Sequence, residues 1–181
     1  MIHAVFLDRD GVLNEAVIRN GKPHPPASVE ELRVVPNAAE ALQKLKNAGF
    51  LLIVVTNQPD VARGNITHAR VEAVNAALSK VLPLDEFRVC CHDDADRCEC
   101  RKPLPGMLLA AAREHGIDLA NSYLVGDRWR DIDAGAAAGC RTVLIDRGYG
   151  EPAPVNPPSH RTRDLEGAVR FILQTYCVSK P

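Results

Sequence analysis

The feature that most constrains this chain is an apolar run near its N-terminus that stops at two carboxylates. Residues 4–7 are continuously apolar, and Asp8, Asp10 and Gly11 follow them with a single arginine between the two acids. A continuous apolar run is typical of a parallel strand buried on both faces, and α/β proteins place their ligand sites at the carboxyl ends of such strands. The sequence therefore predicts a strand over residues 2–7 with Asp8 at its tip.

The spacing of the two carboxylates indicates a metal. Two acids this close resist ionising together unless a cation joins them, so Asp8 and Asp10 point to a hard divalent ion, most simply Mg²⁺. The alternative is a polar turn that ends the strand, because Asp-Gly is a common turn pair. The motif alone leaves both interpretations open, since short motifs carry a real false-positive risk.

Downstream of this motif, apolar runs alternate with helical periodicities. The runs predict further strands at residues 50–55, 87–90, 122–125 and 142–145. Apolar residues at helical spacing, with capping or helix-starting residues at Asn37, Thr67, Pro105 and Asp164, predict helices over residues 37–49, 67–81, 105–116, 131–138 and 164–173. We expect a long loop at residues 14–31, a short extended piece at 32–35 and irregular structure at 148–158.

The alternation of strands and helices predicts the fold class. It indicates an α/β fold in three layers, a doubly wound parallel sheet with helices on both faces. No insertion between the second and third strands is long enough for a large cap domain. A chain of 181 residues without an evident linker or repeat is expected to form a single domain over residues 1–181.

Composition narrows the possible partners. The formal net charge is −1 and only 4% of the residues are aromatic, which disfavours a nucleic-acid-binding module, the main alternative of a different class. No apolar stretch approaches the length of a membrane span, and the N-terminus lacks the pattern of a signal peptide. We therefore expect a cytoplasmic protein that acts as a monomer, without nucleic-acid or membrane partners.

Polar residues follow three of the expected strands. Asp8 and Asp10 follow the first strand, Thr56 the second and Asp127 the fourth, while Lys102 precedes a helix on the same side of the topology. In a doubly wound sheet these positions can meet at the switch point beside the first strand. Together they supply a nucleophile, an acid/base, a hydroxyl donor, a cation and a metal carboxylate. That set suits phosphoryl transfer through an aspartyl-phosphate, although each residue alone could be an ordinary turn or surface group.

These motifs carry a family resemblance. The stretches 8–11, 55–57 and 126–131, together with Lys102, resemble the four motifs of the haloacid dehalogenase (HAD) superfamily of phosphatases. The resemblance extends from the first strand to the fifth. It implies a HAD-like Rossmannoid fold and an Mg²⁺-dependent phosphoric monoester hydrolase.

The resemblance also implies residue roles. Asp8 would be the nucleophile, and Asp10 the general acid and then the base for the hydrolytic water. Mg²⁺ would be held by Asp8, Asp127 and the backbone carbonyl of Asp10. Asp131 is expected to support this cluster without binding the metal directly.

Further residues are expected to contact the substrate. Thr56 and Lys102 would bind the transferring phosphoryl oxygens, with Arg101 assisting them. Asn57 and Gln58, which follow Thr56, are expected to contact the substrate as well.

Within the superfamily, the closer resemblance is to the group of heptose-bisphosphate and histidinol-phosphate phosphatases. It rests on the stretches 56–58 and 62–64 and on a Cys/His segment directly before residues 101–103, whereas Pro59 and Asp60 depart from the usual pattern. The expected reaction is hydrolysis of the 7-phosphate of D-glycero-D-manno-heptose 1,7-bisphosphate, a step toward lipopolysaccharide precursors. The alternative substrate is histidinol phosphate.

The choice between these substrates depends on charges outside the catalytic cluster. A sugar bisphosphate needs a second anion site, and the candidates are Arg63, Arg19 and Lys22. Histidinol phosphate instead carries cationic groups that carboxylates would bind. Its candidate partners are Glu15, Glu30, Glu31 and Asp60.

Four of the six cysteines lie in one short segment, residues 90–100, which indicates a metal loop rather than a disulfide framework. Cys90, His92, Cys98 and Cys100 supply three thiolates and an imidazole, a set that matches a closed structural Zn²⁺ site. Cys91 is expected to be the spare thiol, because adjacent Cys91 and His92 would need a strained turn and the family pattern also selects Cys90. The alternative is a chance cluster of reduced thiols.

Overall fold

The computed structural model of the chain describes residues 1–19 and 22–178, without the side chains of Lys22, Cys177 and Val178. Its middle layer is a six-stranded sheet with the order β5-β4-β1-β6-β7-β8, in which every neighbouring pair is parallel. The strands are β1 (Ala4–Leu7), β4 (Leu51–Asn57), β5 (Glu86–Cys90), β6 (Tyr123–Gly126), β7 (Arg141–Ile145) and β8 (His160–Thr162).

This strand order determines where a site can form. The chain moves outward from β1 through β4 to β5, then returns to the other side of β1 and continues through β6 to β8. The direction of winding therefore reverses beside β1. In open α/β sheets ligands bind outside the carboxyl ends of the strands at such a reversal. The acids that follow β1 lie at that point.

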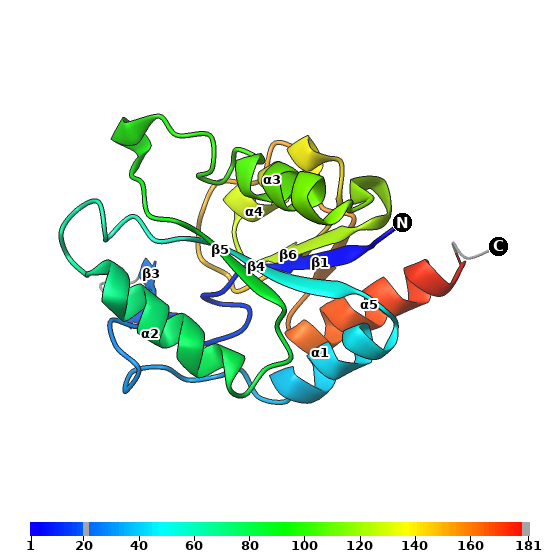
Figure 1. Cartoon of the computed structure of the whole chain (residues 1–181), viewed down its shortest axis with the longest axis horizontal. Helices are drawn as coiled ribbons and strands as arrows, with labels where there is room; N and C mark the ends of the chain where they lie inside the picture. Colours follow the sequence, from blue (N-terminus) through cyan, green and yellow to red (C-terminus); the bar gives the residue numbers. More distant parts are fainter. Residues whose placement is uncertain (20–21, 179–181) are drawn as a thin grey trace.

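Helices cover both faces of the sheet, as the sequence predicted (Figure 1). One face is covered by α1 (Ala38–Asn47), α2 (His68–Ser79) and α5 (Leu165–Val178), and the other by α3 (Gly106–His115) and α4 (Trp129–Ala138). The expected α/β fold class is confirmed. None of the helices in the described part of the chain has the length and apolar character needed to cross a membrane.

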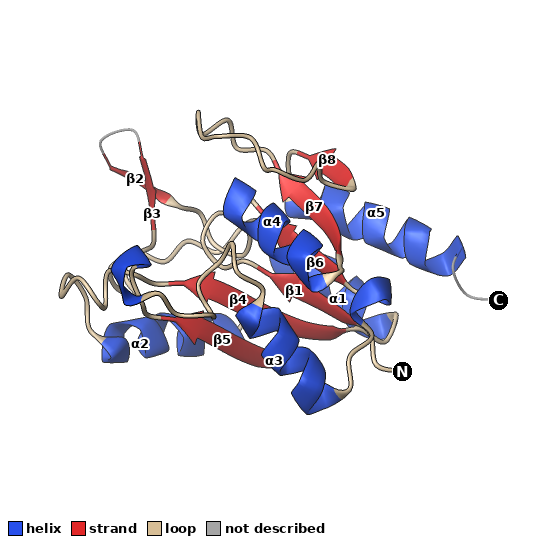
Figure 2. Ribbon diagram, turned by 90° about the horizontal axis from the view of Figure 1, so that it is seen from above, coloured by secondary structure: helices blue, strands red, loops and turns tan. Residues whose placement is uncertain are grey.

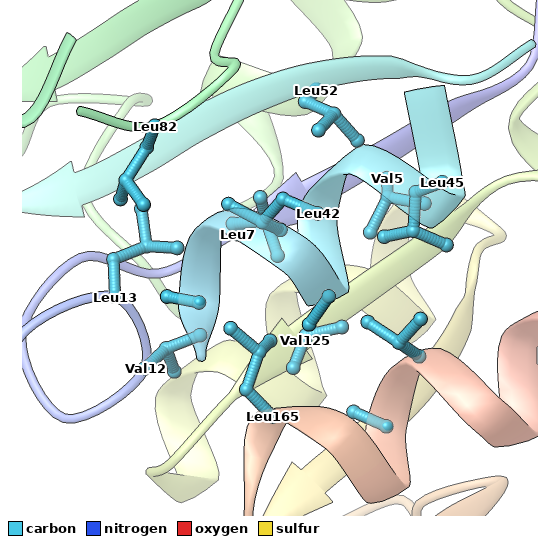
Figure 3. Packing of buried hydrophobic residues seen from close by; sticks show 14 of the residues in the cluster. Val5, Leu7, Val12, Leu13, Leu42, Leu45, Leu52, Leu82, Val125 and Leu165 are labelled. Atoms are coloured by element: carbon cyan, nitrogen blue, oxygen red, sulfur yellow. The ribbon is translucent and has the colours of Figure 1, made fainter. Parts of the chain in front are cut away.

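Two apolar clusters, one on each face, hold these layers together. Every residue of β1 is fully buried, as expected for a central parallel strand covered on both sides. Figure 3 shows how Leu42 and Leu45 of α1 and Leu165 of α5 pack with Val5 and Leu7 of β1. Ala4 and Phe6 of the same strand belong to the cluster on the other face. The continuous apolar run that predicted the strand therefore contributes alternate side chains to the two clusters.

The segment between β1 and α1 is not the simple loop that the sequence predicted. The strands β2 (Val17–Arg19) and β3 (Lys22–His24) pair as an antiparallel hairpin that projects from the carboxyl edge of the sheet (Figure 2). The sequence does contain a hairpin signal that the prediction missed. An Asn-Gly pair, which favours a two-residue hairpin turn, separates the two short runs at positions 20–21. Of the extended piece expected at residues 32–35, only Val34 forms a bridge, to Asn14.

Several element ends also differ from the sequence prediction. β1 begins at Ala4 rather than at residue 2, β8 was not predicted, α2 ends at Ser79 rather than at residue 81, and α5 continues to Val178 rather than ending at 173. β8 is only three residues long and reads HRT, which carries no apolar signal. No helix or strand forms in residues 148–158, as expected.

Two of the three expected side-chain caps are confirmed. The Thr67 hydroxyl accepts a hydrogen bond from the backbone N–H of Arg70, and the Asp164 carboxylate accepts one from that of Gly167. Asn37 is different, because its backbone is left-handed (φ 59°) and its side chain does not cap α1. Its amide instead donates to Glu166 in α5, so a tertiary contact replaces the local one.

Candidate active site

A pocket lies at the carboxyl ends of β1, β4 and β6. Its floor contains the residues that the sequence singled out for phosphoryl transfer, namely Asp8, Asp10, Thr56, Asn57, Lys102, Asp127 and Asp131. Its rim is formed by Ala16, Pro23, His24, Pro25, Arg128 and Arg130. The sheet topology thus brings together side chains from four separate parts of the chain.

Lys102 is the buried centre of this floor. Its Nζ donates to Asp8 Oδ1 at 2.8 Å, to Asp131 Oδ1 at 2.6 Å and to the carbonyl oxygen of Val55 at 2.7 Å. Burial alone would lower the pKa of Lys102, but the Asp131 and Asp8 carboxylates raise it above its usual value. The side chain therefore stays cationic, with all three of its donors directed at the site.

Asn57 fixes the position of this lysine. Its Nδ2 donates to the carbonyl oxygen of Lys102 at 3.0 Å, and its Oδ1 accepts from the backbone N–H of Lys102 at 3.1 Å. Asn57 was expected to contact substrate. It lines the pocket, but both polar groups of its side chain bind the Lys102 backbone.

Asp8 and Asp127 form a buried acidic pair whose charge Lys102 compensates only in part. Burial is the main reason why the pKa of Asp8 is raised to about 7, with Lys102 opposing the shift. Burial, and then the Asp8 carboxylate, also raise the pKa of Asp127. Neither carboxylate oxygen of Asp127 accepts a hydrogen bond of normal geometry, although both are buried. Buried acids in this condition need a further cation.

The donor set fits a divalent cation. Carboxylate oxygens of Asp8, Asp127 and Asp131 lie within 4.8 Å of one another. Both oxygens of Asp131 are already used, Oδ1 by Lys102 and Oδ2 by the backbone N–H of Arg128 at 3.1 Å. Asp127, whose oxygens have no such partner, therefore offers the free ligand atoms, and oxygen ligands of this kind suit Mg²⁺.

Two glycines let these carboxylates approach the backbone. Gly11 has φ +91°, and a Cβ added there would lie 1.8 Å from Asp127 Oδ2. A Cβ on Gly126 would lie 2.1 Å from Asp131 Cβ. No larger side chain fits at either position without displacing an acid of the site.

Asp10 is held from several directions. Its carboxylate accepts from Gln58 Nε2 at 2.8 Å, from Asn14 Nδ2 at 3.0 Å and from Arg9 Nε at 3.2 Å. Gln58 also donates to the Thr56 hydroxyl at 2.9 Å and is fully buried. Gln58 was expected to contact substrate, but it connects Asp10 to Thr56 behind the pocket and does not line it.

The arginines expected at the substrate lie elsewhere. Arg63 forms a bidentate ion pair with Asp93, with both N···O distances at 2.7 Å, and Arg101 Nε donates to Asp94 Oδ1 at 2.7 Å. Neither arginine lines the pocket. Arg19 pairs with Glu31 at the protein surface, and the side chain of Lys22 lies outside what the structure describes.

Arg128 and Arg130 are pocket-lining cations that the sequence analysis did not name as substrate contacts. Both line the pocket, and both belong to the stretch 126–131 that carries Asp127 and Asp131. Arg128 is paired with Glu151. Arg130 has only distant polar partners, with Nη1 3.5 Å from the carbonyl oxygen of Lys102 and 3.6 Å from Asp94 Oδ1, and its guanidinium lies 4.7 Å from the ring centroid of Trp129.

The Cys/His loop forms a second candidate metal centre. Its ligand atoms are close together: Cys90 Sγ is 3.7 Å from both His92 Nδ1 and Cys98 Sγ and 3.2 Å from Cys100 Sγ, while Cys100 Sγ is 3.3 Å from His92 Nδ1. Sulfur atoms at about 2.3 Å from a tetrahedral Zn²⁺ are about 3.8 Å apart. The cluster is thus close to the size of a zinc tetrahedron, and Cys91 is not part of it.

Comparisons with known proteins point to one family. A family model described as HAD-hydrolase-like matches residues 99–176. The D-glycero-beta-D-manno-heptose-1,7-bisphosphate 7-phosphatase of Yersinia pestis is 35% identical, over 96% of this chain and 91% of that protein. The D-glycero-D-manno-heptose-1,7-bisphosphate 7-phosphatase of Thermosynechococcus vestitus is also 35% identical, over 93% of this chain and 94% of that protein.

Solved structures agree with the sequence comparisons. The D,D-heptose 1,7-bisphosphate phosphatase from B. bronchiseptica, crystallised with magnesium and phosphate, has a TM-score of 0.81 and 32% identity to this chain. The match covers 96% of this chain and 99% of that one. The likeness therefore extends over nearly the whole of both chains.

Proposed function

We propose that this chain removes the 7-phosphate from D-glycero-D-manno-heptose 1,7-bisphosphate. The chain belongs to the HAD-like hydrolases and, within them, to the family of the D-glycero-D-manno-heptose-1,7-bisphosphate 7-phosphatases. The products are heptose 1-phosphate, a precursor for lipopolysaccharide, and inorganic phosphate. The observation that carries the proposal is the buried Asp8–Lys102–Asp127 cluster at the switch point of the sheet.

The chemistry proceeds in two displacements at phosphorus. A carboxylate oxygen of Asp8 attacks the phosphorus atom, the bond from phosphorus to the C7 oxygen breaks, and Asp10 gives a proton to the departing oxygen. Water then attacks the aspartyl-phosphate and gives its proton to Asp10. The second step releases phosphate and restores the Asp8 carboxylate.

The surrounding residues neutralise the charge that develops on the phosphoryl oxygens. Lys102 and the Thr56 hydroxyl face the pocket beside Asp8 and supply a cation and a hydrogen-bond donor. Asp8, Asp127 and the backbone carbonyl of Asp10 would hold Mg²⁺. The ion, when bound, neutralises the acids and polarises the phosphoryl group. The structure of the B. bronchiseptica relative contains magnesium, which supports Mg²⁺ as the ion.

The second phosphate of the substrate needs a cation on the pocket rim, and Arg130 is the best candidate. The other arginines considered, Arg63, Arg101 and Arg128, each have a carboxylate partner at hydrogen-bonding distance. The Arg130 guanidinium has no polar partner closer than 3.5 Å among the described residues. It can therefore bind a phosphate bidentately without first breaking a close ion pair.

The same geometry disfavours histidinol phosphate. None of the acids that would bind its cationic groups, Glu15, Glu30, Glu31 and Asp60, lines the pocket. The rim presents two arginines instead. A ligand whose distal end is cationic would meet like charge there, and a distal phosphate would meet opposite charge.

The Cys/His loop supports a structural Zn²⁺ site formed by Cys90, His92, Cys98 and Cys100. Four protein ligands leave no open position, so the ion would order residues 90–100 rather than perform chemistry. Through the bonds from Arg101 to Asp94 and from Arg101 to the carbonyl oxygen of His92, an ordered loop would also keep the segment before Lys102 in place.

Three broader expectations belong to the same proposal. A thiolate metal site persists in a reducing compartment, which supports a cytoplasmic enzyme. Residues 1–181 are expected to act as one domain with the metal loop inserted at 90–100. The monomeric state remains a prediction that gel filtration with light scattering would test.

The experiment compares kcat/KM for heptose 1,7-bisphosphate, as both anomers, with that for heptose 7-phosphate and for histidinol phosphate. We expect the bisphosphate to be preferred, and better turnover of histidinol phosphate would refute the substrate assignment. Arg130→Ala should lower the ratio of kcat/KM for the bisphosphate to that for heptose 7-phosphate by about 10- to 100-fold, as expected for a charge-assisted phosphate contact. The matched control is Arg63→Ala, whose guanidinium pairs with Asp93 outside the pocket and which should leave this ratio unchanged.

A further inference from the structure

Arg9, the residue between the two catalytic acids, has the largest fully buried side chain in the described structure. Only 1% of it is exposed. Its Nη1 donates to Asn75 Oδ1 at 2.9 Å, while Nε lies 3.2 Å from both oxygens of Asp10 and Nη2 lies 3.1 Å from Oδ2. A buried arginine needs such partners, because an unpaired guanidinium loses its solvation.

Asn75 reaches this position from the core-facing side of α2. The buried residues of that helix are Val71, Val74, Asn75 and Leu78, a helical i, i+3, i+4, i+7 stripe in which one member is polar. Asn75 is 8% exposed. A polar side chain in an apolar stripe needs a specific partner, and here the partner is Arg9.

We infer that Arg9 and Asn75 act as a positioning pair that orients the Asp10 carboxylate toward the leaving oxygen. The guanidinium is a rigid fork, so anchoring Nη1 on Asn75 determines where Nε and Nη2 present their protons to Asp10. Gln58 and Asn14 hold the same carboxylate from other directions. Among the described residues that bind this carboxylate, only Arg9 links it to a helix of the scaffold. The inference rests on the proposed function only in that Asp10 is the proton donor.

A positioning role differs measurably from a purely structural one. Proton donation matters most when the leaving group is a poor one, so a misplaced acid slows poor leaving groups more than good ones. Because kcat/KM reports the first phosphoryl transfer, its dependence on the leaving group reports the placement of Asp10. A loss of folded protein would instead lower kcat/KM for all substrates by the same factor.

The test measures kcat/KM for 2,4-dinitrophenyl, p-nitrophenyl and phenyl phosphate. Asn75→Leu keeps the side-chain volume but removes the hydrogen-bond acceptor. In this variant kcat/KM for phenyl phosphate should fall about 10-fold more than kcat/KM for 2,4-dinitrophenyl phosphate. This difference is a part of the acceleration of about 100- to 10,000-fold that a general acid supplies. Asn75→Asp, which retains an acceptor oxygen, should restore a near wild-type dependence. The matched control is Ser79→Ala, which removes a hydroxyl that donates to the backbone carbonyl oxygen of Asn75 at 3.1 Å but leaves the Asn75 side chain and its bond to Arg9 in place.

Equal losses for all three substrates in Asn75→Leu would overturn the inference, as would the same steep dependence in Asn75→Asp. If Asn75→Leu does not fold, Asn75→Ser withdraws the acceptor and carries the same expectation. Aryl phosphates contain no sugar, so the outcome does not depend on heptose bisphosphate being the substrate. Asp10→Asn serves as the reference: if its dependence is no steeper than that of the wild type, the role of Asp10 in the proposed function fails first.

Discussion

Gly11→Ala separates the cost of a strained backbone from the loss of the metal site. Gly11 follows the acidic motif with φ +91°, and its missing Cβ leaves the space that Asp127 occupies. An added Cβ would lie 1.8 Å from Asp127 Oδ2, whereas ordinary contacts begin at 3.4 Å. The carboxylate must therefore move by about 1.6 Å. Because the clash falls on the end of a side chain, the acid moves and the fold remains.

Two magnitudes follow from this geometry. A left-handed backbone costs a residue with a Cβ about 1–2 kcal/mol. For a chain of this size, that corresponds to a decrease in Tm of about 2–8 °C. Displacement of a reacting group by about 1 Å can cost about 100-fold in rate, so we expect kcat to fall by at least that factor. We also expect a higher Mg²⁺ concentration for half-maximal activity, because Asp127 would no longer face Asp8.

The control is Gly49→Ala. Gly49 has nearly the same backbone angle, φ +94°, but a Cβ there would meet nothing within 4 Å. Thermal unfolding should therefore show similar destabilisation in both variants, while Mg²⁺ titrations of p-nitrophenyl phosphate turnover should differ in Gly11→Ala only. The reasoning is refuted if Gly11→Ala keeps wild-type kcat and Mg²⁺ activation, or if Gly49→Ala loses them equally.

Three further predictions concern the acids and the metals. Asp8→Asn should abolish turnover and Asp10→Asn should reduce it at least 100-fold, with both variants still folded. Full activity of Asp8→Asn would contradict the covalent mechanism. The purified protein should contain about one zinc per chain, lost in Cys98→Ser and Cys100→Ser but retained in Cys91→Ser, with metal content measured by elemental analysis. Without Mg²⁺, Tm should fall as the pH rises from about 4 to about 7. In the folded protein the pKa of Asp8 is raised to about 7, so Asp8 keeps a proton in this pH range, whereas in the unfolded chain its pKa is 3.8 and the proton is released. Saturating Mg²⁺ should flatten this decline, and an identical pH profile with and without the ion would argue against Asp8 as a ligand.

The elements with a strong local signal were predictable from the sequence. The buried strands β1, β4 and β6 are continuous apolar runs, and the caps at Thr67 and Asp164 form where the sequence placed them. The floor of the pocket was predictable for a related reason. Most of its residues lie at or just after the carboxyl ends of β1, β4 and β6. The order of such strands in the sheet is restricted by the rules for parallel α/β folds.

The ends and edges of the fold were less predictable. Asn37 has the residue type of a cap, yet its side chain bonds to Glu166, which is 129 residues away. The strand β8 lies at the edge of the sheet and pairs with β7 alone among the described strands. An edge strand is less enclosed than a central one, and β8 has no apolar run that would predict it. Local sequence preference is weak where a distant contact can replace a local one.

The substrate side of the site depended on the tertiary structure for the same reason. Arginines are recognisable in the sequence, but their partners are not. Arg63 is paired with Asp93 of the Cys/His loop, whereas Arg130 lines the pocket with only distant partners among the described residues. Likewise, nothing local links Arg9 to Asn75, which is 66 positions further along the chain. By itself, the sequence determined which acids reach the pocket, because Asp8 and Asp127 directly follow β1 and β6 and short-range covalent geometry ties them to the strand ends. Which cations remain free for the substrate, and which side chains hold Asp10 in place, was decided only in the folded chain, because long polar side chains take whichever opposite charge the packing of the elements brings within reach.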